Sequence, residues 1–87
     1  MHAVIVKVSI KDRDSADNSL REEVVPRVSQ APGFVAGYWT RKDNTGLSMI
    51  ILESEEHANR MSEMVPSLVP DTVTLEDVEV REVAAHA

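Results

Sequence analysis

Alternating β-branched residues dominate the first segment of the chain, His2-Ala-Val-Ile-Val-Lys-Val-Ser-Ile10. Successive side chains of a strand point to opposite faces, so this pattern predicts a strand with two unlike faces. One face is wholly apolar and carries Val4, Val6, Val8 and Ile10. The other face is mixed and carries Ala3, Ile5, Lys7 and Ser9. The chain must therefore build a sheet with at least one fully buried side.

A helix is expected next, because three apolar residues recur at four-residue spacing: Leu20, Val24 and Val28. Either Asp14 or Ser15 caps its start, or Ser19 and Glu22 form a capping box. Pro26 lies inside this pattern. It should kink the helix, because its ring removes an N–H and crowds the preceding turn.

Two strands joined by a tight turn are expected after this helix. Residues 34–41 carry all the aromatic residues of the chain, Phe34, Tyr38 and Trp39, and residues 47–53 form the next apolar run. Between them, residues 42–46 read Lys-Asp-Asn-Thr-Gly, a composition typical of a hairpin turn. We expect Asn44 and Gly46 to adopt positive φ there.

A second helix and a last strand complete the chain. Ser54 is a good N-cap, and the helix stripe consists of Ala58, Met61 and Val65. We expect this helix to end at or before Pro66. The last strand runs from about Thr72 to Val83. Its apolar alternation slips by one near Glu76 and Asp77, which indicates a β-bulge.

The order β-α-β-β-α-β predicts an α+β, ferredoxin-like fold, in which a four-stranded antiparallel sheet carries two helices on one face. With 87 residues, the chain is expected to form one domain, residues 1–87. The helices cover only one side of the sheet. If Phe34 points to the helices, Val35 and Trp39 join the helix-free face and Tyr38 points to the helix side.

The helix-free face is therefore expected to be apolar as well. The strand at residues 47–53 adds either Leu47, Met49 and Ile51 or Ser48, Ile50 and Leu52 to it. Soluble monomers rarely expose so large an apolar patch. The simplest cover is the same face of a second copy, so we predict a homodimer through this face.

Charge and cysteine content exclude several classes of function. Nine basic and fifteen acidic residues give a formal net charge of −6, which leaves no basic face for nucleic acid or for an anionic membrane. The chain has no cysteine, so disulfides and thiolate chemistry are excluded and a cytoplasmic location is expected. His2 and His86 could approach each other, because the first and last strands are neighbours in this fold, but two ligands on frayed chain ends make a poor site, so we expect no metal. We expect His57 to be exposed to solvent.

Polar atoms on an otherwise apolar sheet face either lie at the rim, in contact with water, or line a ligand cavity between two paired sheets. We expect five residues to line it: Lys7, Trp39, Ser48, Ile5 and Ile50. Trp39 would stack on a planar ligand or pack in the dimer interface. Lys7 would bind an anionic oxygen or extend to the rim. No set of catalytic residues is evident.

The chain resembles the dimeric α/β-barrel superfamily, and within it the antibiotic biosynthesis monooxygenase (ABM) type. The resemblance rests on the element order, on Pro32-Gly33-Phe34 leading to Tyr38-Trp39, and on Glu53-Ser54-Glu55-Glu56 before the second helix. It implies a homodimer whose sheets form a barrel, often with a ligand chamber in each protomer. The family includes cofactor-independent oxygenases, haem-degrading enzymes and isomerases.

The haem-degrading pattern of this family is not matched here. It places an asparagine on the first strand, a tryptophan at the end of the third strand and a histidine on the second helix. This chain has no asparagine in the first strand, has Leu52-Glu53 at the end of the third, and has Ser62 near the histidine position. Two hypotheses follow. The chain is a monooxygenase acting without a cofactor on an aromatic or polycyclic molecule, or it is a non-catalytic homodimeric module that binds a small hydrophobic ligand or another protein.

Overall fold

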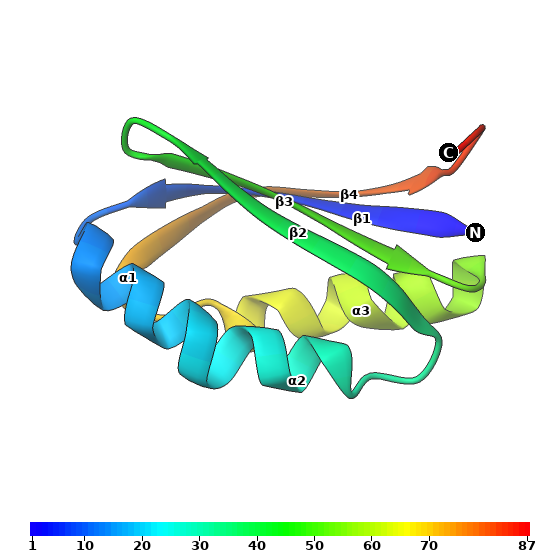
Figure 1. Ribbon diagram of the computed structural model, residues 1–87, viewed down its shortest axis with the longest axis horizontal. Coiled ribbons are helices and arrows are strands. Elements are labelled where there is room, and N and C mark those ends of the chain that lie inside the picture. Colours follow the sequence, from blue (N-terminus) through cyan, green and yellow to red (C-terminus); the bar gives the residue numbers. More distant parts are fainter.

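The computed structural model describes residues 1–87 and contains one four-stranded sheet. Its strands are β1 (His2–Ile10), β2 (Phe34–Lys42), β3 (Thr45–Leu52) and β4 (Val73–Glu82). They lie in the order β2-β3-β1-β4, and every neighbouring pair is antiparallel. All helical segments lie on one face of this sheet (Figure 1). The predicted ferredoxin-like architecture is confirmed.

The first helical region is divided into α1 (Arg13–Ser19), a π-helix η1 (Leu20–Val24) and α2 (Val25–Ser29). Its N-cap is Asp12, whose carboxylate accepts a hydrogen bond from the Ser15 N–H at 3.2 Å. The three starts expected from the sequence were therefore wrong. Asp12 has an extended backbone, which lets its short side chain reach back over the first turn.

The distortion expected at Pro26 takes the form of the wider π-helical turn before it. The Val25 N–H donates to the carbonyl of Leu20, five residues back, where an α-helix would use the residue four back. Pro26 lies in the first turn of α2, where its missing N–H costs least. The chain therefore changes its helical winding between α1 and α2 while the helix continues.

Helix α3 (Glu55–Leu68) begins as expected, because the Ser54 hydroxyl accepts a hydrogen bond from the His57 N–H. Its predicted stripe is confirmed, since Ala58, Met61 and Val65 are buried. The predicted end at Pro66 was wrong, because the helix continues to Leu68. Pro66 is exposed, and the Val69 N–H still donates to the Val65 carbonyl, so the proline does not interrupt the last turn of the helix.

The backbone of the β2–β3 hairpin differs from the sequence prediction, whereas the bulge in β4 agrees with it. In the hairpin, positive φ falls on Asp43 at 55°, and neither Asn44 nor Gly46 adopts it. Gly46 is instead a buried residue of β3. The bulge expected in β4 is confirmed: Lys7 pairs with Asp77 and Val8 with Leu75, so Glu76 is the extra residue.

A second bulge, in β2, reverses the expected orientation of its aromatic residues. The pairing of β2 with β3 shifts between Phe34 and Ala36. Beyond this shift, Trp39 lies opposite Ser48, which in turn lies opposite the buried Val6. Trp39 therefore faces the helices, and the prediction that it lies on the helix-free face or in a dimer interface was wrong. Tyr38 takes the helix-free face instead.

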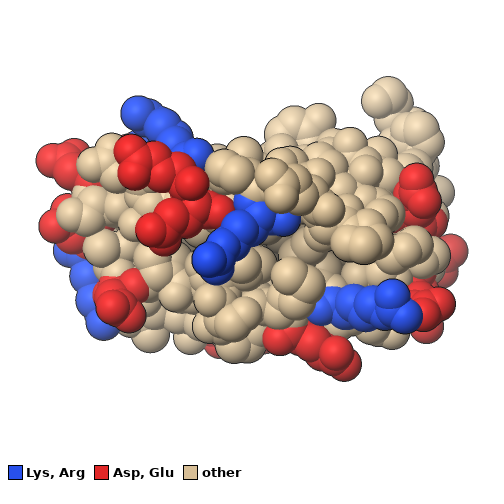
Figure 2. Space-filling view, turned by 90° about the horizontal axis from the view of Figure 1, so that it is seen from below, with Lys and Arg blue, Asp and Glu red and all other residues tan.

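The core lies between the sheet and the helices. Its eight buried residues are Val4, Val6, Val28, Ile50, Leu52, Ala58, Met61 and Val65. On the helix side of the molecule, basic and acidic side chains are interspersed and do not gather into a basic face (Figure 2). None of the helices has both the length and the apolar character needed to span a membrane.

Candidate functional site

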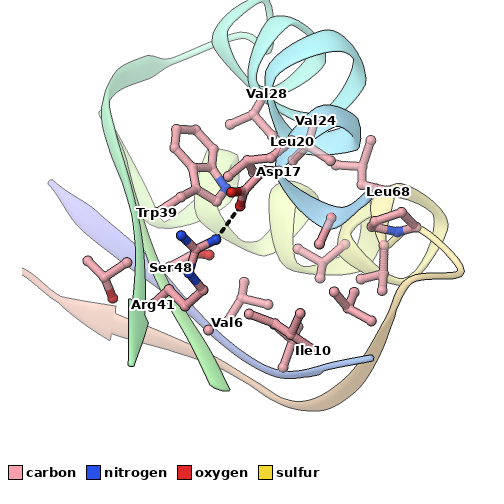
Figure 3. Close-up of a pocket in the computed structure, with 18 of the residues that line it drawn as sticks. Val6, Ile10, Asp17, Leu20, Val24, Val28, Trp39, Arg41, Ser48 and Leu68 are labelled. Atoms are coloured by element: carbon pink, nitrogen blue, oxygen red, sulfur yellow. Dashed lines mark hydrogen bonds and ion pairs between the residues drawn. The ribbon is translucent and has the colours of Figure 1, made fainter. Parts of the chain in front are cut away.

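A pocket of about 510 Å³ lies between the sheet and the first helical region. The two helical regions pack unequally: α3 packs on β1, β3 and β4 and α2 packs on β2, whereas α1 and η1 make fewer contacts with the sheet. The pocket has 21 lining residues, of which 13 are hydrophobic. Figure 3 shows its apolar side chains converging from strands and helices on one interior space. Its size is within the range of small-molecule sites.

The apolar walls come from three directions. The sheet supplies Val6, Val8, Ile10, Trp39, Ile50 and Val73. The first helical region supplies Ala16, Leu20, Val24 and Val28, and the end of α3 with its following loop supplies Val65, Leu68, Val69 and Pro70. Hydrophobic residues make up most of the lining, so the pocket favours a largely apolar guest.

Trp39 is the largest side chain in the pocket, and its position depends on Gly37. A Cβ added at Gly37 would come within 2.8 Å of Trp39 Cη2 and 2.9 Å of Cζ3. The indole therefore lies over the glycine backbone two residues before it. Its edge reaches the pocket, where its flat face is suited to stacking on a planar molecule.

An ion pair stands beside Trp39. Arg41, on the same face of β2, donates through Nη1 to the Asp17 carboxylate of α1, as the dashed line in Figure 3 marks. Both side chains are about one third exposed. Arg13 and Arg21 also line the pocket, and Ser48 supplies a hydroxyl group; Thr40 borders the pocket, but its side chain is on the helix-free face. The Thr40 hydroxyl is already engaged, since it donates to the Leu47 carbonyl at 2.6 Å.

The structure divides the five predicted cavity residues between two faces of the sheet. Trp39, Ser48 and Ile50 line the pocket together. Lys7 and Ile5 do not: both lie on the helix-free face, where Ile5 pairs with Met49 and Lys7 with Leu47. The cavity expected between paired sheets stays a prediction, and the pocket that the single chain shows lies beneath the helices.

Sequence reasoning missed Arg41 and Asp17. Arg41 follows Trp39 by two residues and so shares its face, a signal that was available once the orientation of Trp39 was known. Asp17 could not be found in this way, because its meeting with Arg41 depends on how α1 is placed over the sheet.

The histidines do not build a reactive centre. His57 was expected to be exposed but is half-buried, with Nδ1 2.8 Å from the Ser54 hydroxyl and its ring against Gly33. His2 lies 3.4 Å from a Glu55 carboxylate oxygen. No three His, Cys, Asp or Glu residues lie close enough together to hold a metal ion. The only ionisable side chains lining the pocket are three arginines and Asp17.

The helix-free face is largely apolar across β2, β3 and β1, whereas β4 adds the charged residues Asp77, Glu79 and Arg81 along one edge. Three rows cross it from β2 to β1: Ala36–Ile51–Ala3, Tyr38–Met49–Ile5 and Thr40–Leu47–Lys7. The β3 residues on this face are thus Leu47, Met49 and Ile51. The solvent-accessible area of the chain is 5627 Å². That is roughly 500 Å² more than area scaling gives for a compact monomer of this mass.

Comparisons with known proteins support the fold. No family model matches the sequence, and no curated protein matches it. Among solved structures, the chain is similar to the haem degrader MhuD from Mycobacterium tuberculosis, which was solved with two haems bound in its active site. The identity is 14%, the TM-score is 0.57, and the match covers 97% of this chain and 98% of MhuD.

The pocket residues do not suit haem iron. Proteins hold haem iron through histidine, cysteine, methionine or tyrosine, and none of these lines the pocket. The one carboxylate there, on Asp17, is bonded to Arg41. The likeness to MhuD is therefore one of fold: both chains have a ferredoxin-like fold.

Proposed function

We propose that this protein binds a planar, largely apolar small molecule in the pocket between α1, η1 and the sheet. The observation that carries the proposal is the pocket itself, with a volume of about 510 Å³ and 13 hydrophobic residues among the 21 that line it. Trp39 supports a planar guest, because offset stacking on an indole favours flat rings. The one carboxylate in the lining, Asp17, is bonded to Arg41, which supports binding as the primary role.

The proposal includes a homodimer joined through the helix-free face. Apolar side chains on this face, among them Val35, Leu47 and Met49, are exposed in the single chain. Pairing two such faces by a two-fold axis would remove them from water without blocking the pocket, which lies on the other side of the sheet. Ligand binding and dimer formation therefore use opposite faces.

Binding is tested with N-phenyl-1-naphthylamine, an uncharged and flat apolar probe. Trp39 is the only tryptophan, so its emission reports the pocket directly. We expect saturable quenching in the wild type. In Gly37→Ala we expect about tenfold weaker binding, because the new Cβ displaces the indole, together with a stability loss of about 1–3 kcal/mol from overpacking.

Tyr38→Phe serves as the matched control, since it alters the neighbouring residue of β2 on the opposite face. It should bind the probe as the wild type does. Circular dichroism would confirm that each variant is folded. Probe binding that leaves Trp39 emission unchanged, or that is equally tight in Gly37→Ala, would contradict the proposed site.

Cofactor-independent oxygenation is the second candidate. It is favoured by the position of Trp39 opposite Ser48, which places an aromatic surface and a hydroxyl together in the pocket. Anthrone is a suitable substrate to test, since it supplies its own electrons: anthrone and O₂ give anthraquinone and water. We expect the wild type to consume O₂ faster than Trp39→Ala. Equal rates for the two proteins would leave binding as the function.

A further inference from the structure

The charge of the pocket is opposite to the charge of the chain. The protein has a formal net charge of −6, with only nine basic residues in total. Three of these, Arg13, Arg21 and Arg41, line one pocket together with a single carboxylate, Asp17. The lining is therefore positive by two charges, and its remaining polar groups are neutral. An acidic protein that gathers arginines around an apolar pocket has a site suited to an anion.

We propose that the ligand is an amphipathic anion whose oxyanion, such as a carboxylate or sulfonate, binds Arg41 in place of Asp17. This inference rests on the proposed function, because it assumes that the pocket takes an apolar molecule at all. It adds the chemical class of that molecule and assigns a recognition residue to it.

The placement of Arg41 supports this assignment. Trp39 and Arg41 are two residues apart on the same face of β2, a separation of about 7 Å along a strand. That distance is close to the span of an aromatic ring with its substituent. A flat molecule stacked on Trp39 therefore places a polar substituent at the guanidinium, whose planar fork binds carboxylate oxygens in pairs.

The existing partner of Arg41 is one that a ligand can replace. The Arg41–Asp17 pair is about one third exposed on both sides, and ion pairs in contact with water add little stability. Both side chains line the pocket and bridge it, Arg41 from the sheet and Asp17 from α1 (Figure 3). Asp17 thus keeps the guanidinium oriented and competes with the incoming anion for it.

This competition predicts opposite effects at the two positions. Removing Arg41 should weaken anion binding, whereas removing the Asp17 charge should strengthen it. If the pocket bound its ligand only through apolar contacts, neither substitution would change the affinity for an anion relative to that for a neutral molecule. The two variants therefore separate anion recognition from general hydrophobic binding.

The experiment compares 8-anilinonaphthalene-1-sulfonate with N-phenyl-1-naphthylamine, the same molecule without the sulfonate. Each is titrated into the full chain while Trp39 emission is measured. We expect the wild type to bind the sulfonate about tenfold more tightly, in line with a hydrogen bond to a charged group. Arg41→Gln should abolish this preference, and Asp17→Asn should increase it severalfold. Neither variant should change the affinity for the neutral probe by more than about twofold.

Lys42→Gln is the matched control, because it removes one positive charge from the adjacent residue, which does not line the pocket. It should retain the preference for the sulfonate. Equal binding of both probes by the wild type, or loss of the preference in Lys42→Gln as well, would overturn the inference and leave the proposed function standing. If neither probe quenches Trp39, the proposed function itself fails.

Discussion

In the proposed homodimer, Met49→Glu should separate the two copies and leave a monomer of 9.6 kDa at micromolar concentration. Met49 lies in the middle row of the helix-free face, between Tyr38 and Ile5, and is 44% exposed in the single chain. In a dimer joined through this face, a glutamate there would be transferred from water into apolar surroundings. Burying an unpaired charge costs several kcal/mol, enough to weaken association by orders of magnitude.

Sedimentation velocity would measure this change, with Met64→Glu as the matched control. Met64 has nearly the same exposure, 41%, but lies on α3 and hence on the opposite side of the sheet. Its variant should sediment with the wild type as a dimer. A wild-type species of 9.6 kDa at micromolar concentration would rule out the dimer. Equal behaviour of the two variants would place the contact elsewhere.

Leu52→Ala should lower the free energy of unfolding by about 2–5 kcal/mol. Leu52 is fully buried, faces the helices, and belongs to the core formed with Val4 and Met61. Removal of its branched end leaves a cavity that the surrounding strands cannot close. For a chain of this length the total stability is of the order of 4–13 kcal/mol, so this one substitution removes a large share of it. Urea denaturation followed by circular dichroism would measure the loss.

Leu47→Ala provides the comparison for Leu52, since it makes the same change on the same strand at a site that is 49% exposed. In the single chain it should cost well under 1 kcal/mol. If Leu47 lies in the dimer interface, its cost should grow with protein concentration, because dimer formation adds to apparent stability. A Leu52→Ala variant as stable as Leu47→Ala would contradict the position of the core.

The elements that could be predicted from the sequence are those whose signal is local. The alternation of β1 and the stripe of α3 identify their buried faces without reference to the rest of the chain, and Ser54 marks the helix start through a contact three residues away. The extra residue in β4 was visible because it interrupts an otherwise regular alternation.

The faces of β2 and β3 could not be settled in the same way. Both alternate sets of β3 residues are largely apolar, so the pattern does not choose between them. In β2, the bulge between Phe34 and Ala36 changes the parity of every later residue, and a one-residue shift moves a whole strand to the other face. Because Trp39 was assigned to the wrong face, the sequence did not reveal the pocket that this residue lines beneath the helices.

The position of Asp17 at the mouth of the pocket depends on the number of residues in the π-helical turn between α1 and α2, as well as on which residues line the pocket. Successive residues of a helix are turned by about 100°, so deletion of one residue from η1 would rotate α1 by that angle relative to α2. Asp17 would then swing away from Arg41 while every pocket side chain on the sheet stayed in place. An insertion or deletion in this turn would therefore change the ligand preference of this protein without altering a single residue of the pocket floor.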